Sequence, residues 1–153
     1  FSCIVCLMGV SVSTNIGQQI GPEFQCLISW KLSKVRQIIT EFKNKNYDYV
    51  LDENNIALMI PKLESKSINQ IIKSLSPSPN VLLVDSTMFL LLLTTLSDES
   101  DEGLKEKLEV MFDIFDFDSR GRLNLDELLF LLVNFALGLL KAVGMSMTDY
   151  QLE

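Results

Sequence analysis

The feature that most limits what this chain can fold into is the twelve-residue segment DFDSRGRLNLDE, from Asp116 to Glu127. Acidic residues stand at its first, third and twelfth positions, and Gly121 stands at the sixth, where a sharp turn favours a residue without a Cβ. A hard divalent cation needs about six to eight oxygen ligands, which early acids and a closing bidentate glutamate can supply. The segment therefore predicts a loop built around a metal ion.

The loop positions define the predicted ligands. The acids would bind through their carboxylates, the seventh residue through its backbone carbonyl, and the ninth directly or through water. We therefore expect one Ca²⁺ site, with the ligands Asp116, Asp118, Arg122, Asn124 and Glu127.

The fifth position of the loop departs from this pattern. It carries Arg120, whose side chain offers no oxygen and brings a positive charge close to the expected ion. Two interpretations therefore stay open: a loop that binds calcium, and a loop that keeps its fold without a metal.

Apolar residues recur at helical spacing on both sides of the loop. Before it they are Leu108, Met111, Phe112 and Phe115, and after it they are Leu128, Leu131, Leu132 and Phe135. A helix, a twelve-residue acidic loop and a second helix resemble the EF-hand family of calcium-binding proteins. The resemblance implies that Leu123, at the eighth position, pairs with a neighbouring loop.

The same apolar frame occurs twice upstream, which predicts two further, degenerate EF-hands. In the first, the loop KNKNYDYVLDENN has Asn54 and Asn55 where the closing glutamate belongs. In the second, the loop SPSPNVLLVDST has Val81 in place of the glycine and Thr87 in place of the glutamate. We expect neither loop to bind a divalent ion.

These repeats predict an all-α fold of EF-hand helix–loop–helix pairs in two lobes, of which the second is incomplete. The expected segments are an N-terminal extension (residues 1–30), a degenerate EF-hand pair (31–96), an acidic linker (97–103), the hand with the intact loop (104–143), and the start of a further helix or a tail (144–153).

Composition argues against several classes of function. The net charge of −7 disfavours a phosphate-rich partner, so we expect no binding to nucleic acid. The chain has no histidine, which removes the usual general base, and it has no glycine-rich phosphate loop. Its three cysteines cannot complete a four-ligand zinc site without histidine. We therefore expect a protein that is not an enzyme.

The helix after the loop is apolar on nearly every side. Leu129, Phe130, Val133 and Leu140 lie off the expected core stripe. A helix of this kind must be buried in a larger assembly or in a membrane, and its apolar run is too short to span a bilayer. We therefore expect one or more protein partners to bind the segment from Leu128 to Leu140, in a hetero-assembly rather than a homo-oligomer.

The resemblance implies an intracellular calcium-binding subunit, structural or calcium-responsive, within a larger complex. The chain is similar to protist ciliary EF-hand proteins, which implies a place in the axoneme of a cilium or flagellum, and otherwise in the cytoplasm. Two alternatives stay open. One is a regulatory subunit of a phosphatase or kinase similar to calcineurin B, and the other is an EF-hand adaptor that binds no metal.

Overall fold

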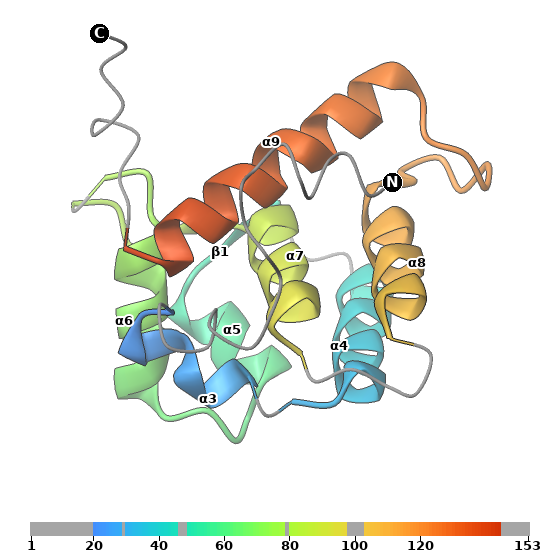
Figure 1. The fold of residues 1–153 in the computed structure, drawn as a ribbon. Helices are drawn as coiled ribbons and strands as arrows, with labels where there is room; N and C mark the ends of the chain where they lie inside the picture. The colour runs from blue at the N-terminus through green and yellow to red at the C-terminus, as the bar shows by residue number, and fades with distance from the viewer. Residues whose placement is uncertain (1–19, 29, 46–48, 79, 98–102, 145–153) are drawn as a thin grey trace, which may run out of the picture.

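The chain folds into packed helices (Figure 1). The computed structural model describes residues 20–28, 30–45, 49–78, 80–97 and 103–144. In chain order the elements are η1 (Pro22–Phe24), α3 (Gln25–Ile28), α4 (Leu32–Lys45), β1 (Val50–Leu51), α5 (Glu53–Met59), α6 (Ser65–Leu75), β2 (Val84–Asp85), α7 (Ser86–Leu96), α8 (Leu104–Phe115) and α9 (Leu125–Ala142). This mostly helical content confirms the expected all-α class.

Two consecutive units have the order helix–strand–helix. They are α4–β1–α5 and α6–β2–α7, and their short strands pair antiparallel, with Leu51 opposite Val84. Both of these side chains are completely buried, and most residues of the apolar frames predicted for residues 31–96 are also buried. The two units therefore share one core through the strands that join their loops.

Helix α7 lies at the centre of the core. Nearly all of its residues are buried, and helices α4, α8 and α9 pack around it, as Figure 1 shows. Its apolar run continues around the whole helix circumference, which is the pattern of a helix enclosed on every side. The fully enclosed helix of this chain is therefore α7 rather than α9.

The hydrophobic core is continuous from Ile20 to Ala142. It includes Phe24 and Leu27, which lie in the segment expected as an N-terminal extension, and it continues beyond the expected linker into α8 and α9. The amide of Gly21 donates to the carbonyl of Ala142 (2.8 Å), which joins the two ends of the described chain. Residues 1–19 and 29 of the predicted extension, residues 98–102 of the predicted linker (97–103) and residues 145–153 of the predicted tail (144–153) lie outside the described residues.

Two lysines stabilise the ends of buried helices. Lys107 is almost fully buried, and its ammonium donates to the carbonyls of Thr95 (3.1 Å) and Ser97 (2.5 Å) at the C-terminus of α7. Lys141 donates to the carbonyls of Leu75 and Ser76 at the end of α6. Positive charge at a helix C-terminus satisfies carbonyls that have no partner within the helix and interacts favourably with the helix dipole.

The buried faces of α8 and α9 agree only in part with the predicted stripes, of which Met111 and Phe115 are buried in α8. Leu108 is 40% exposed, because α8 turns Val110 and Ile114 toward the core in its place. Leu128 is also exposed, and α9 packs inward through Leu131, Phe135 and their helical neighbours. Both helices carry more than one apolar stripe, and packing on α7 decides which one is buried. Within the described ranges, no helix is both long enough and apolar enough to cross a membrane.

Candidate functional site

The predicted metal loop connects α8 to α9 and begins with a tight turn around Asp116. Its carboxylate accepts hydrogen bonds from the backbone amides of Arg120 (3.0 Å) and Gly121 (2.8 Å). Gly121 has a φ of 70° and Ser119 a φ of 55°, so the chain turns sharply at both residues. Glycine adopts this conformation without strain, which explains its place at the sixth position. The first carboxylate of the predicted ligand set therefore organises the loop backbone.

The end of the loop is fixed by a reciprocal cap on α9. The side chain of Asn124 accepts from the amide of Glu127 (2.9 Å), and the carboxylate of Glu127 accepts from the amide of Asn124 (2.8 Å). This capping box satisfies two backbone donors at the helix N-terminus and places a buried carboxylate beside the positive end of the helix dipole. The predicted ninth and twelfth ligands thus position each other.

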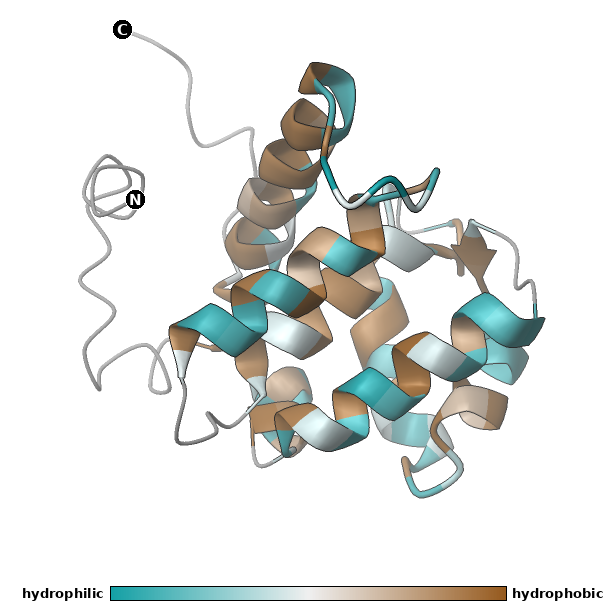
Figure 2. Cartoon of the chain, turned by 90° about the vertical axis from the view of Figure 1, so that its right-hand side faces the viewer, coloured by the Kyte–Doolittle hydropathy of each residue, from teal (hydrophilic) through white to brown (hydrophobic). Residues whose placement is uncertain are grey.

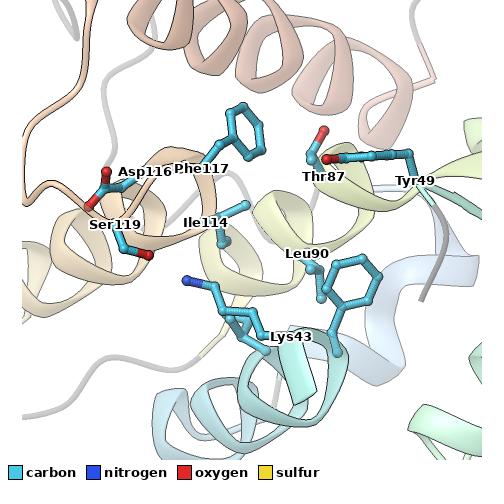
Figure 3. Close-up of a pocket in the computed structure, with 10 residues that line it drawn as sticks. Lys43, Tyr49, Thr87, Leu90, Ile114, Asp116, Phe117 and Ser119 are labelled. Atoms are coloured by element: carbon cyan, nitrogen blue, oxygen red, sulfur yellow. The ribbon is translucent and has the colours of Figure 1, made fainter. Parts of the chain in front are cut away.

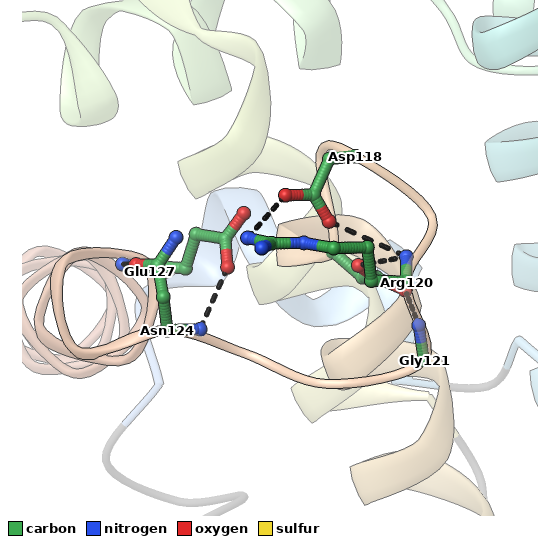
Figure 4. A network of polar contacts seen from close by, with 6 residues as sticks. Asp118, Arg120, Gly121, Asn124 and Glu127 are labelled. Carbon is green, nitrogen blue, oxygen red and sulfur yellow. Dashed lines mark hydrogen bonds and ion pairs between the residues drawn. The ribbon is translucent and has the colours of Figure 1, made fainter.

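Arg120 directs its side chain into the loop. Its guanidinium forms an ion pair with Asp118 and lies between Asp118 and Glu127 (Figure 4). The hydrogen bond from Arg120 lowers the pKa of the Asp118 carboxyl below its usual value. Asp118 in turn raises the pKa of Arg120, and the negative charges of Glu127 and Asp116 add to this effect. A cationic group of the chain therefore lies among all three predicted carboxylate ligands.

The loop fits a calcium ion in the type and order of its donors. In the part of the chain that the structure describes, however, no three acidic, cysteine or histidine side chains lie close enough together to hold an ion. Binding would require Asp118 to release Arg120, and Glu127 to turn away from the Asn124 amide. Arg122, predicted to offer its carbonyl, is exposed at the surface of the loop.

Helix α8, the loop after it and α9 form a third unit, and all three units begin their second helix with the same type of cap. The side chains of Asp52, Asp85 and Asn124 accept from the backbone amide three residues ahead of them, and each follows an apolar residue: Leu51, Val84 and Leu123. These caps provide a common frame for the loops. In this frame Met88 replaces Thr87 as the closing residue of the second loop, one position later than the sequence pattern predicted.

The two upstream loops are held by hydrogen bonds of the chain itself. In the first, Asp52 and Asn55 form a capping box, with Asn55 at the closing position. In the second, the Ser76 hydroxyl lies within hydrogen-bonding distance of the carbonyls of Val81 and Leu83 (2.7 Å to Leu83). That neither loop binds a divalent ion stays a prediction.

A cavity of about 470 Å³ adjoins the start of the third loop (Figure 3). Helices α4, α7 and α8 contribute both apolar and polar side chains to its wall, while Asp116, Phe117 and Ser119 form its edge on the loop side. The amine of Lys43 donates to the carbonyl of Asp113 and so connects α4 to α8 beside the cavity. Sequence reasoning did not find this cavity, because the residues around it come from distant segments that carry no shared motif.

The first half of α9 presents an apolar surface, which we name the outer face: Leu125, Leu128, Leu129, Phe130 and Val133. Leu129 and Val133 are 51% and 53% exposed, which confirms that they lie off the core stripe. Phe130 is also exposed, but its ring packs edge-on against buried Phe115 (5.7 Å between centroids). The expected partner segment is thus accessible at its beginning and partly covered toward Leu140.

Comparison of the chain with known protein families, curated proteins and solved structures found no match.

Proposed function

We propose that this chain is an EF-hand-type subunit that binds one calcium ion in the loop from Asp116 to Glu127 and binds a protein partner through the outer face of α9. The observation that carries the proposal is the repeated frame of the three units. The caps of Asp52, Asp85 and Asn124 start the second helix at equivalent positions, and the first two loops pair through residues at the eighth position. Paired loops with this register support an EF-hand architecture.

The choice of the third loop as the metal site rests on its donors. It combines two early carboxylates with a closing glutamate, whereas the other loops close with Asn55 and Met88. Calorimetric titration of the purified chain with Ca²⁺ should give a stoichiometry of one. In an NMR titration the amide of Gly121 should shift most, because its acceptor Asp116 would bind the ion. Binding of two or more ions would refute this assignment. It would also be refuted if amide signals of an upstream loop shifted at a lower calcium concentration than those of this loop.

The ion pair of Arg120 with Asp118 favours a second candidate, an EF-hand adaptor that binds its partner without metal. In this candidate the guanidinium acts as a tethered cation that neutralises the loop carboxylates. The comparison of Arg120→Gln with Arg122→Gln separates the two candidates. Calcium binding by the unmodified chain supports the first, and calcium binding that appears only in Arg120→Gln supports the second. Arg122 contributes its backbone to the proposed site, so its substitution serves as the control for lost surface charge.

The assembly and its location are also proposals. The outer face of α9 supports a protein partner, because contiguous apolar surfaces mark interaction sites. Identification of the chains that copurify with the tagged protein distinguishes two kinds of subunit. A subunit similar to calcineurin B should copurify with a single catalytic chain, and a structural subunit should copurify with non-catalytic chains. The axonemal location rests on the sequence resemblance alone. Fractionation of isolated cilia would test it, and recovery of the protein outside the axoneme would contradict it.

A further inference from the structure

The outer face of α9 forms a continuous apolar stripe. Leu128 and Leu129 lie three and four residues after Leu125, and Val133 lies four residues after Leu129, so these side chains are neighbours along one side of the helix. Phe117, which is 47% exposed, extends this surface onto the loop. Figure 2 shows that apolar residues predominate along α9. A contiguous apolar surface is unfavourable in water, so we expect another apolar segment to bind it.

The N-terminal segment of the chain begins at the other end of the same helix. Ile20 is buried, and the next residue, Gly21, hydrogen-bonds to Ala142 in the last turn of α9. Residues 1–19 therefore continue from a point fixed beside the C-terminus of α9. Their sequence, FSCIVCLMGVSVSTNIGQQ, contains no charged side chain, and its first ten residues are almost all apolar.

The segment is long enough to reach the outer face. From Ala142 back to Leu129 the helix spans thirteen residues, or about 20 Å at the rise of an α-helix. Nineteen residues extend to about 60 Å as an open chain and to about 28 Å as a helix. Either conformation places the apolar residues around Ile4 and Leu7 within reach of Leu129 and Val133.

We propose that residues 1–10 of this chain bind the outer face of α9 in the same molecule. The segment would bury its own apolar side chains together with those of α9, and residues 1–10 carry no charged side chain whose desolvation would oppose this contact. Attachment of the segment beside Ala142 raises its effective concentration at the outer face above that of a free partner. The segment thus competes with any external partner for this surface.

The cysteines of the chain provide a direct test. A nitroxide label is attached to Cys6 in a chain carrying Cys3→Ser and Cys26→Ser, and the loss of amide NMR signal is mapped in the metal-free protein. We expect the signals of residues 125–133 to weaken, while those of α5, which packs against α4 and α6, stay unchanged. Unchanged signals over residues 125–133 would overturn the proposal.

Two further experiments identify which segment binds the outer face. Leu129→Glu should restore the signals of α9, whereas Leu58→Glu, at an exposed leucine of α5, should leave them weakened. Both leucines are exposed, so neither change removes a core side chain. In a further experiment, chains that carry the nitroxide are mixed with isotope-enriched chains that carry none. Weakening of the NMR signals of the enriched chains would identify a second copy as the occupant and overturn the proposal. The test requires neither calcium nor a partner, so its failure would not affect the proposed function.

Discussion

Glu127 has two roles that substitution can separate, because it caps α9 and is the predicted closing ligand. Glu127→Gln keeps an oxygen that can accept from the Asn124 amide, and it loses the charge beside the helix N-terminus, which should cost about 0.5 kcal/mol. Glu127→Ala removes the cap as well, at about 1–2 kcal/mol, or a Tm lower by roughly 4 °C. Thermal unfolding in the presence of a chelator should show this difference.

Both variants should bind calcium at least about tenfold more weakly, a loss of about 1.4 kcal/mol, because neither offers a bidentate carboxylate. Asn55→Ala is the matched control, because it removes the equivalent cap of α5. It should lower the Tm by a similar amount and leave the calcium affinity unchanged in calorimetry. Wild-type calcium affinity in Glu127→Gln would refute the role of Glu127 as a ligand. Equal Tm values for Glu127→Gln and Glu127→Ala would refute the cap argument.

Three further outcomes follow from packing. Leu51→Ala, at the buried strand pair, should lower the free energy of unfolding in urea titration by about 2–5 kcal/mol. Leu58→Ala, at an exposed position, should change it by less than about 0.5 kcal/mol. Similar values for the two variants would contradict the shared core of the first two units. Lys107→Met should destabilise by about 1.5–3 kcal/mol through the lost charged hydrogen bonds, and an unchanged urea midpoint would show that water replaces the amine. Leu129→Glu should reduce the recovery of partner chains with the tagged protein while circular dichroism stays unchanged, and undiminished recovery would place the partner elsewhere.

The sequence predicted the buried residues of the first two units well, because α4 and α6 each carry one apolar stripe and α7 is apolar on every side. Ile68, Ile71, Ile72 and Leu75 are a clear example, and all four are buried in α6. In α8 the sequence offers two stripes, one with Leu108 and Phe112 and another with Val110 and Ile114. Periodicity cannot choose between such stripes, because the choice depends on which side faces α7 in the folded chain.

The sequence predicted that the loop from Asp116 to Glu127 connects two helices, but it did not predict the orientation of Arg120. Spacing predicts Asp116 as the first residue of the loop, and in the structure its carboxylate accepts from the backbone amides of Arg120 and Gly121. A long cationic side chain at an exposed turn has the same sequence signature whether it extends into solvent or folds onto Asp118. Three nearby carboxylates favour the second orientation, and their proximity exists only after the loop has closed.

Each of the three loops is closed by groups of the chain itself. Asn55 caps the first, the Ser76 hydroxyl connects the second, and the Arg120 guanidinium lies among the carboxylates of the third. In the proposed calcium site, the ion would have to displace Arg120 from Asp118. Glu127 would then exchange its bond to the Asn124 amide for the ion, at the turn where α9 and its outer face begin. If the loop binds calcium as proposed, this change at the start of α9 would lie directly beside the outer face.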